Sequence, residues 1–333
     1  MLCPAKINLG LQVHHRRAAD GYHFISSIFL PIDFGDTLTI TEVPGSPAES
    51  DRLTTDNELP DAIRADFELV SERSGSEADA PGGSSDSQRQ NSGGAPASAS
   101  EANLVWRALA ETQDLRDTAL HAHLIKRVPT GGGLGGGSSD AGTLLAWIRD
   151  RFDRSNDELL PIASKLGADV PFFLHGKPAL LHGTGDIIEE IQVGAGLGVL
   201  CFPMLKIDTG IAYSQLKRTL QPAPPPRILS GLRTDTRAAL ARSDWNAVRD
   251  DLNNDFEAPA FAMHTSLGSV KKAFFDHGAR FASLSGSGSS LYGLVSDKTE
   301  QQRVLERMQK QFSDFRFQPF QFAGSASTNS DSR

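Results

Sequence analysis

The chain contains few residues of several kinds, and each shortage excludes a class of protein. Its 333 residues include only two cysteines, Cys3 and Cys201, which excludes a disulfide framework and a cysteine-based metal site. No apolar run approaches the roughly 20 residues of a membrane span. The amino terminus also lacks the apolar stretch of a signal peptide. We therefore expect a cytoplasmic protein whose cysteines are reduced.

Positive charge is also scarce. The 33 Lys and Arg residues against 41 Asp and Glu residues give a net charge of −8, without a basic tail that would indicate nucleic-acid binding. The nine histidines form no H-x-x-x-H pair, and no G-x-S-x-G segment occurs, so neither a protein metal cage nor serine hydrolase chemistry has support. We expect no nucleic-acid partner, no membrane association and no obligate protein partner.

Glycine is abundant in one segment. Residues 129–139 read Pro-Thr-Gly-Gly-Gly-Leu-Gly-Gly-Gly-Ser-Ser. Without Cβ atoms, successive backbone N–H groups can approach a polyanion closely. Ser138, Ser139 and Asp140 are capping residues, and the apolar residues behind them recur at helical spacing, which predicts a helix over 138–150. The positive end of that helix would add to the donors of a phosphate-binding loop.

Two other interpretations of this loop stay open from the loop alone. A G-x-G-x-x-G match runs through Gly131, Gly133 and Gly136, but no clear βαβ unit with a ribose-binding acid follows it. A flexible glycine linker is the second interpretation, which the predicted helix start disfavours. A Walker loop is excluded because Gly176-Lys177 is followed by Pro178.

The pattern of elements indicates an α+β protein of two domains that meet near residue 190. Alternation from Ile7 to Val13 predicts a strand that places Lys6 and Asn8 on one face. Further strands are predicted at 37–43, 120–128, 197–203, 280–284, 290–296 and 315–322. Helices are predicted at 61–72, 103–113, 138–150, 157–166, 212–220, 227–241, 244–252 and 259–277. The domains are predicted as 1–190 and 191–323, with a disordered insertion at 74–100, a proline-rich turn at 223–227 and a disordered tail at 324–333.

Four short segments carry polar groups that suit chemistry. Asp169 follows a predicted helix, where a carboxylate either closes a turn or deprotonates a hydroxyl. Asp20-Gly-Tyr-His23 is typical of a turn that presents an aromatic ring and an imidazole to a base, although Tyr22 and His23 could equally be buried at a strand start. Residues 283–290 form a hairpin turn or a second anion-binding loop. Thr209 is predicted to cap the helix that follows it.

Taken in order, these segments resemble the GHMP kinase superfamily of small-molecule kinases, whose phosphate loop has the form P-x-x-x-G-L-G-x-x-S-S. The matching segments are Pro4-Ala-Lys-Ile-Asn-Leu9, Ala19-Asp-Gly-Tyr-His23, Pro129 to Ser139, Leu166-Gly-Ala-Asp-Val-Pro171, Ile207-x-Thr209-x-x-x-Tyr213, Asn254-Asp-x-Glu257 and Ser285-Gly-Ser-Gly-Ser-Ser290. Ala-Lys-Ile-Asn combined with Asp-Gly-Tyr-His resembles the branch of the superfamily that phosphorylates the 2-hydroxyl of CDP-methylerythritol in isoprenoid synthesis. A GHMP kinase for another alcohol, such as homoserine or mevalonate, and a nucleotide-binding regulator remain alternatives.

The resemblance implies a catalytic domain like domain 2 of ribosomal protein S5, a ferredoxin-like C-terminal domain, and ATP as co-substrate. It implies Asp169 as the base and Lys6 as its electrostatic partner. Substrate binding is implied for Asn8, Tyr22, His23, Thr209 and Tyr213, with cytosine between Tyr22 and Tyr213 and His23 at its edge. Nucleotide binding is implied for Asn103, Pro129, Gly131, Gly132, Gly133, Leu134, Gly135, Gly136, Gly137, Ser138, Ser139, Ser285, Gly286, Ser287 and Gly288.

Two expectations concern charge near the phosphates. Mg²⁺ is expected from the chemistry of ATP, and Ser139 is predicted as its protein ligand. Asp140 stands where the family often has asparagine. It adds a negative charge near the phosphates unless it caps the helix or faces away.

Overall fold

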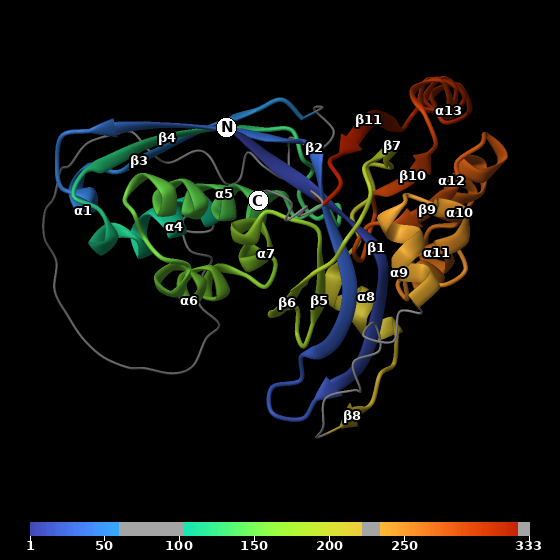
Figure 1. The fold of residues 1–333 in the computed structure, drawn as a ribbon, viewed down its shortest axis with the longest axis horizontal. Helices are drawn as coiled ribbons and strands as arrows, with labels where there is room; N and C mark the ends of the chain where they lie inside the picture. Colours follow the sequence, from blue (N-terminus) through green and yellow to red (C-terminus); the bar gives the residue numbers. More distant parts are fainter. Residues whose placement is uncertain (60–102, 222–233, 326–333) are drawn as a thin grey trace, which may run out of the picture.

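The computed structural model describes residues 1–59, 103–221 and 234–325 of the chain. The predicted helix at 61–72, the predicted insertion at 74–100 and the proline-rich turn at 223–227 lie outside these described residues. In the described part, no helix is long and apolar enough to cross a membrane. The polypeptide forms two β-sheets, and helices α4–α7 and α9–α13 lie toward opposite ends of the molecule, with the long β1–β2 pair between them (Figure 1).

The first sheet has seven strands and is built around a long antiparallel pair. Its strands are β1 (Leu2–Arg17), β2 (His23–Val43), β3 (Arg52–Asn57), β4 (Ala119–Lys126), β5 (Ala179–His182), β6 (Ile187–Glu190) and β8 (Leu220–Gln221). The strand order is β3-β4-β2-β1-β8, with β5 beside β2 and β6 beside β5. In the register of β1 and β2, Lys6 pairs with Pro31 and Asn8 with Phe29. The predicted common face of Lys6 and Asn8 follows from this pleat.

Helices cover one side of that sheet. They are α1 (Pro47–Ser50), α4 (Leu104–Glu111), the 3-10 turn η1 (Gln113–Leu115), α5 (Gly136–Arg151), α6 (Asn156–Leu166) and α7 (Val170–His175). Helix α5 buries Leu144, Leu145 and Ile148 against a core that includes Leu38 and Leu124 of the sheet. This packing fixes the start of α5, and therefore the glycine-rich segment before it.

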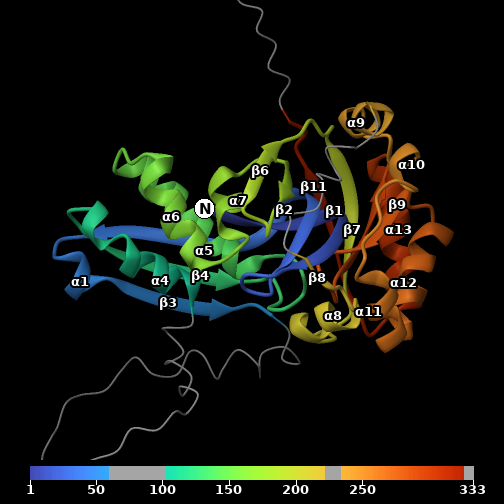
Figure 2. The same cartoon turned by 90° about the horizontal axis from the view of Figure 1, so that it is seen from below.

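The second sheet has four strands in the order β11-β7-β10-β9. These are β7 (Gly196–Phe202), β9 (Phe281–Leu284), β10 (Leu291–Val295) and β11 (Arg316–Phe322). The accompanying helices are α8 (Thr209–Gln215), α9 (Thr234–Ala241), α10 (Trp245–Val248), α11 (Glu257–Met263), α12 (Thr265–Asp276) and α13 (Lys298–Gln311). Figure 2 shows α12 and α13 packed along one side of this sheet.

One hydrophobic core joins the two sheets. It contains Ile7 and Leu30 of the first sheet together with Phe202 and Tyr292 of the second. Strand β6 ends at Glu190 and β7 begins at Gly196, but β8 returns to the first sheet. The division at 190 therefore stays a prediction. The first residues of the predicted tail are held in place, because the N–H of Ser325 donates to Val193 O at 2.8 Å.

The structure corrects several predicted elements. Helix α5 begins at Gly136 rather than Ser138, because Gly135 adopts a φ of +70° and occupies the N-cap position. The predicted helix over 212–220 ends at Gln215 and is followed by the short strand β8, while the predicted helix over 259–277 is two helices that meet at His264. Helix α13 and strands β3, β5 and β6 were not predicted. The predicted cap at Thr209 is wrong, because the Asp208 side chain accepts the Ile211 N–H instead.

Candidate active site

Two glycine-containing loops meet where the two sheets approach each other. One follows β4 of the first sheet, and the other connects β9 and β10 of the second. The first is the glycine loop, residues 129–137, and the second is the turn Ser285–Gly288, which we call the serine-glycine loop. A Cβ atom on Gly133, whose φ is +77°, would lie 1.9 Å from Ser285 O. Ser285 Oγ donates to Gly133 O at 2.9 Å, and the Ser290 N–H donates to Gly132 O at 3.2 Å. Glycine at 133 is therefore required by contact as well as by conformation.

The glycine loop separates two cavities. One, of about 490 Å³, is lined by the loop and by the start of α5, with Asn103, Leu104 and Lys126 at its margin. The other, of about 240 Å³, is lined by Lys6, Asp169 and the serine-glycine loop. Gly131, Gly133 and Gly135 line both cavities. The arrangement suits a polyphosphate along the loop, with its end directed into the smaller cavity, which we call the acceptor cavity.

Lys6 is buried on the floor of the acceptor cavity. Its ammonium donates to Asn8 Oδ1 at 2.6 Å and to Gly133 O at 2.9 Å, and lies 4.5 Å from the centre of the Phe29 ring. Burial lowers the pKa of Lys6, while the charge of Asp169 opposes that shift. No ion pair within 4 Å joins Lys6 to Asp169 among the described contacts, and the predicted pairing of their roles stays a prediction.

Asn8 links Lys6 to the serine-glycine loop. Its Oδ1 also accepts the Gly286 N–H at 2.8 Å, and its Nδ2 donates to Ser27 Oγ at 2.9 Å. Both polar ends of this buried amide are thus occupied by protein groups. The predicted substrate-binding role of Asn8 accordingly stays a prediction, and its observed role is to orient Lys6 and Gly286.

Asp169 occupies the N-cap position of α7, yet its side chain makes no capping hydrogen bond. The interpretation that this carboxylate simply closes the turn therefore loses its main support. Asp169 is half-buried and lines the acceptor cavity across from the glycine loop. Together with burial, which acts more strongly, its charge raises the pKa of Tyr213 to about 12. A carboxylate that makes no capping hydrogen bond to its helix is available to accept a proton from a bound hydroxyl.

Aromatic rings lie at the wall of the acceptor cavity, which Tyr213 lines. His23 and Tyr213 stack with ring centres 4.7 Å apart. Tyr22 is 68% exposed and has no ring contact among the described residues, and the predicted place of cytosine between Tyr22 and Tyr213 stays a prediction.

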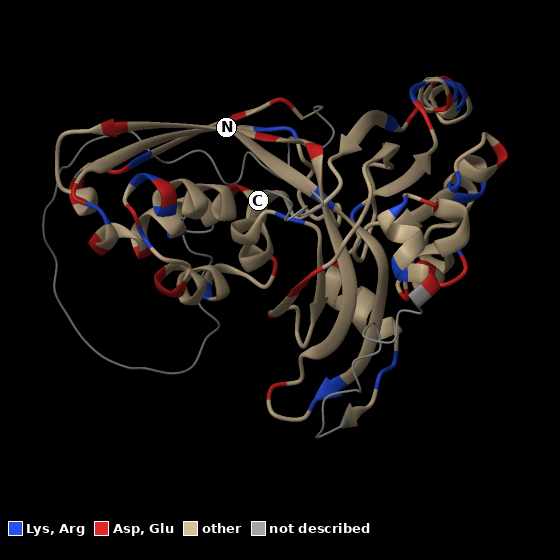
Figure 3. Cartoon of the chain, in the orientation of Figure 1, with Lys and Arg blue, Asp and Glu red and all other residues tan. Residues whose placement is uncertain are grey.

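Lys and Arg residues lie at the end of β1 and in the segment after α8 (Figure 3). The short parallel pairing of β1 with β8 brings these segments together, with Arg16 opposite Leu220. Burial lowers the pKa of His23, and the charges of Arg16 and Arg218 lower it further. A neutral His23 ring is consistent with stacking on Tyr213.

Residues at the start of α5 have different surroundings. Ser138 lines the larger cavity, whereas Ser139 is fully buried and its hydroxyl donates to Pro4 O at 2.6 Å. This contact does not favour the predicted magnesium role of Ser139. Asp140 is also buried and its Oδ2 accepts a hydrogen bond from the Lys126 ammonium at 2.6 Å, so Lys126 offsets part of its charge. Lys126 also bonds Asp36.

Asn103 and Thr209 are placed by local hydrogen bonds. The Asn103 side chain accepts the Val105 N–H at 2.9 Å as the N-cap of α4, at the edge of the larger cavity. Thr209 Oγ1 lies 3.3 Å from Ser287 Oγ and lines the acceptor cavity. Sequence analysis missed Ser27, Lys126 and Tyr292, whose hydroxyl donates to Asn8 O at 2.6 Å. Polar residues inside otherwise apolar strands are the signal that could have found them.

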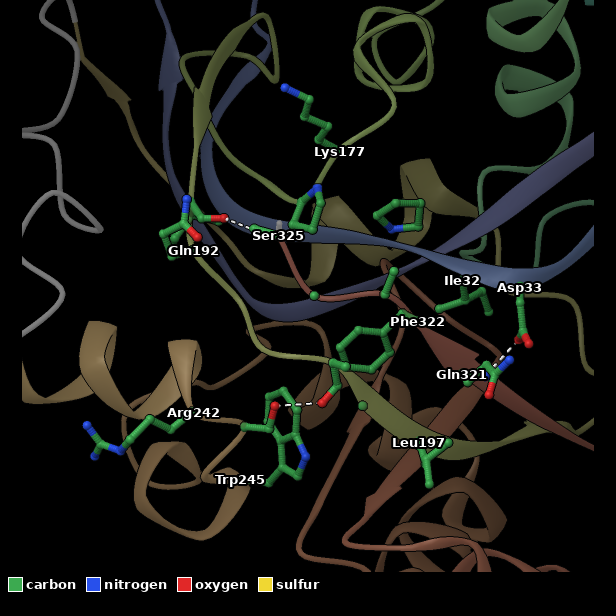
Figure 4. Close-up of a pocket in the computed structure, with 18 of the residues that line it drawn as sticks. Ile32, Asp33, Lys177, Gln192, Leu197, Arg242, Trp245, Gln321, Phe322 and Ser325 are labelled. Carbon is green, nitrogen blue, oxygen red and sulfur yellow. Dashed lines mark hydrogen bonds between the residues drawn. The ribbon is translucent and has the colours of Figure 1, made fainter. Parts of the chain in front are cut away.

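A third cavity, of about 1120 Å³, lies elsewhere and contains none of the predicted site residues. Its walls come from both sheets and include Ile32, Leu197 and Phe322 (Figure 4). Gln321 and Asp33 lie side by side there, joined by a hydrogen bond of 2.7 Å from the Gln321 N–H. Its size alone does not make it the reactive site, because it lacks the glycine loop, Lys6 and Asp169.

Comparison with known families fits this architecture. A family model described as GHMP kinases N terminal domain matches residues 103–177, and one described as GHMP kinases C terminal matches residues 236–314. The fold and the site thus define the class of GHMP kinases, which use ATP as co-substrate and act on small molecules. The predicted two-domain α+β GHMP kinase fold is confirmed.

Individual relatives narrow the class to one family. The 4-diphosphocytidyl-2-C-methyl-D-erythritol kinase of Leptospira interrogans serogroup Icterohaemorrhagiae serovar copenhageni is 34% identical over 97% of this chain and 100% of its own length. The kinase of the same name from Parabacteroides distasonis is 33% identical over 90% and 93%. The chain belongs to the 4-diphosphocytidyl-2-C-methyl-D-erythritol kinase family, and the predicted resemblance is confirmed.

Solved structures agree with this assignment. A crystal structure of 4-(cytidine 5'-diphospho)-2C-methyl-D-erythritol kinase superposes with a TM-score of 0.68 at 27% identity, covering 98% of this chain and 99% of that one. A homoserine kinase from Cytophaga hutchinsonii gives a TM-score of 0.57 at 18% identity, over 96% and 95% of the two chains. The second likeness supports the fold alone.

Proposed function

We propose that the chain transfers the γ-phosphoryl group of ATP to the 2-hydroxyl of 4-diphosphocytidyl-2-C-methyl-D-erythritol, a step of the non-mevalonate route to isoprenoid precursors. The observation that carries the proposal is the pair of cavities that share Gly131, Gly133 and Gly135, with Lys6 and Asp169 in the acceptor cavity only. The family to which the chain belongs supports the choice of acceptor.

In the proposed complex the triphosphate lies along the glycine loop. Backbone N–H groups of the loop and the start of α5 hold the phosphate oxygens. Asn103 and Leu104 then lie toward the nucleoside, because they line the cavity of about 490 Å³ that the glycine loop and the start of α5 enclose. Pro129, Thr130 and Ser138 complete the lining around the phosphates.

The acceptor occupies the other cavity with its hydroxyl next to Asp169. As the hydroxyl oxygen forms its bond to the γ-phosphorus, the bond between that phosphorus and the β,γ-bridging oxygen breaks, and ADP leaves with the electron pair. The hydroxyl proton passes to Asp169. A carboxylate, with an ordinary pKa of about 4, cannot remove this proton in advance, so the proton moves late in the step. Lys6 stabilises negative charge on the reacting oxygens.

The cytidine end of the substrate is assigned to the exposed Tyr22 and to the stacked His23 and Tyr213. A cytosine ring that enters between the rings would replace part of the His23–Tyr213 contact, whose ring centres are 4.7 Å apart. Base stacking on an aromatic side chain contributes about 1–3 kcal/mol. Thr209 and Asn8, which both line the acceptor cavity, are assigned to the methylerythritol moiety.

Mg²⁺ is proposed to enter with the nucleotide. Among the described residues, no group of three His, Cys, Asp or Glu side chains could hold a metal ion. Mg²⁺ is commonly bound by substrate phosphates and water with one or two protein ligands. When bound, it neutralises charge on the β- and γ-phosphates. The free, buried cysteines Cys3 and Cys201 are consistent with a proposed cytoplasmic setting.

Release of ADP from ATP tests this function directly. We expect turnover with 4-diphosphocytidyl-2-C-methyl-D-erythritol and none above background with mevalonate, homoserine or galactose. The phosphorylated product is then identified by mass spectrometry and phosphorus NMR as the 2-phosphate. Turnover confined to one of the other three alcohols would contradict the proposal.

A further inference from the structure

Asn254 is buried between α10 and α11. The proposed chemistry gives this asparagine no role. It belongs to the Asn254-Asp-x-Glu257 segment of the family resemblance, yet it lines neither reactive cavity. Only 4% of its surface is exposed. A fully buried amide has to satisfy two N–H donors and a carbonyl oxygen within the protein, so its partners indicate its role.

All three groups of the Asn254 side chain have partners. Its Nδ2 donates to Leu284 O at 2.8 Å and to Gly286 O at 2.9 Å, while its Oδ1 accepts the Phe256 N–H at 2.9 Å. The amide therefore holds one carbonyl group at the end of β9, that of Leu284, and one in the serine-glycine loop, that of Gly286. The residues on either side of Asn254 are bonded to Leu11 of β1. The Leu11 N–H donates to Asn253 O at 2.8 Å, and the Asp255 N–H donates to Leu11 O at 2.9 Å.

Gly286 is thus held on both sides. Its N–H donates to Asn8 at 2.8 Å and its carbonyl accepts from Asn254 at 2.9 Å. A peptide group is planar, and in its trans form the N–H points opposite to the C=O. The carbonyl of Gly286 points toward Asn254, so the Ser287 N–H of the same plane points away from it.

The Ser287 N–H has no hydrogen-bond partner within the described part of the chain, although the Ser287 hydroxyl lies 3.3 Å from Thr209 Oγ1. Ser287 is half-buried, and Gly286 and Ser287 both line the acceptor cavity. An unpaired amide donor at the wall of a partly enclosed cavity suits an anionic oxygen.

We propose that Asn254 is a positioning residue that aims the Ser287 N–H at the phosphoryl group during its transfer. This inference rests on the proposed kinase function, because the acceptor cavity must receive the γ-phosphate. Asn254 touches neither substrate. It acts through the Gly286–Ser287 peptide, whose rotation would turn a hydrogen-bond donor away from charge that develops in the transition state.

Substitution of Asn254 tests the inference when it is compared with a matched control. Asn254→Ala removes both donors, and Asn254→Ser is a milder change in case the first variant folds poorly. Gln301 offers the control, because its buried Nε2 also donates to two carbonyl groups, Gly198 O at 2.7 Å and Phe320 O at 2.8 Å, in another part of the second sheet. Gln301→Ala therefore reproduces the structural loss away from the site.

We expect both Asn254 variants to lower kcat by about 10- to 100-fold, somewhat less than complete removal of an oxyanion donor costs, with little change in KM for ATP. Gln301→Ala should lower the melting temperature comparably and leave kcat near the wild-type value. Affinity for ADP with aluminium fluoride, a mimic of the transferring phosphoryl group, should fall in the Asn254 variants while affinity for ADP alone is retained.

Different outcomes contradict different claims. Wild-type kcat in a folded Asn254 variant, or equal kcat losses in the Asn254 and Gln301 variants, would overturn the positioning role alone. A wild-type protein that does not phosphorylate the cytidyl substrate would overturn the proposed function. The fluoride-mimic measurement separates the two cases, because it reports on the phosphoryl position without depending on turnover of that acceptor.

Discussion

The ammonium group of Lys6 donates to the side-chain oxygen of Asn8 at 2.6 Å, from two positions earlier on the same strand. The same oxygen accepts the Gly286 N–H at 2.8 Å, and Lys6 also reaches Gly133 O at 2.9 Å. One strand thereby fixes both glycine-containing loops around a buried cation. This geometry holds the acceptor cavity in shape before any substrate enters, which is a requirement for electrostatic catalysis.

Asn8→Ala should lower both the turnover of the site and the stability of the fold. The change leaves Lys6 with one of its two hydrogen bonds and frees the Gly286 N–H, so we expect kcat to fall at least about tenfold. Loss of buried hydrogen bonds of this kind costs about 1–3 kcal/mol each in stability. Steady-state kinetics and urea denaturation of the same preparation measure both effects.

Ser27→Ala is the control for Asn8. It removes the acceptor of the Asn8 Nδ2 group, at 2.9 Å, without touching Lys6 or Gly286. We expect a similar loss of stability with a much smaller loss of kcat. Equal losses of kcat in the two variants would show that Asn8 matters for packing rather than for the orientation of Lys6.

Asp169→Asn should remove the proton acceptor while preserving shape. Since the Asp169 side chain makes no capping bond, the substitution removes no hydrogen bond of α7. We expect kcat to fall at least about 100-fold, the usual cost of losing a general base, with nearly unchanged affinity for ATP. Single-turnover kinetics and calorimetry with an ATP analogue measure the two quantities. Unaltered turnover would remove Asp169 from the mechanism.

The sequence predicted local features of the site better than contacts between distant parts of the chain. Alternation along 7–13 correctly placed Lys6 and Asn8 on one face. The missing Cβ atoms of the glycine-rich segment predicted the close approach of a polyanion, which stays a prediction, while the contact of Gly133 with Ser285 O was not predicted. These features are local, because a strand period and an absent Cβ can be read from neighbouring residues. Helix α13 was missed, although its Asp297 N-cap and Glu300 form a clear start signal.

The remaining contacts depend on residues far apart in the chain. Gly286 reaches Asn8 across 278 positions and Lys126 reaches Asp36 across 90, and neither spacing carries a sequence signal. The Thr209 cap was wrong for a different reason. Asp208 and Thr209 are both good caps, and the choice between them depends on how the chain enters α8, which the second sheet decides.

Asp140→Asn should change how stability depends on pH. Burial raises the pKa of Asp140 from 3.8 to about 7, against the opposing effect of Lys126. Because the folded protein holds this proton more tightly than the unfolded chain, wild-type stability contributed by the group is complete below pH 3.8 and is lost as the pH rises toward 7. The asparagine amide of the variant cannot ionise, so the variant should gain stability relative to the wild type over that interval.

Chemical denaturation of both proteins at several pH values between 4 and 8 measures this difference. Asp250→Asn is a suitable control, because its side chain is 93% exposed and its only close charge partner among the described ion pairs is Arg249 at 3.8 Å. Its stability difference from the wild type should stay flat. A flat difference for Asp140→Asn as well would show that the Asp140 carboxyl titrates near its ordinary pKa.

Two alanine substitutions in the glycine loop should separate backbone strain from steric contact. Gly131 and Gly133 have almost the same φ, +73° and +77°, and alanine at either costs about 1–2 kcal/mol for the left-handed conformation. A Cβ at 131 meets nothing within 4 Å, whereas one at 133 would lie 1.9 Å from Ser285 O. Gly131→Ala should therefore fold with a modest loss of stability, while Gly133→Ala must push the two loops apart.

We expect Gly133→Ala to lose both stability and turnover by much larger factors, measured as melting temperature and kcat. Equal effects of the two substitutions would mean that the loops do not touch as described, and that the glycines are needed for conformation alone.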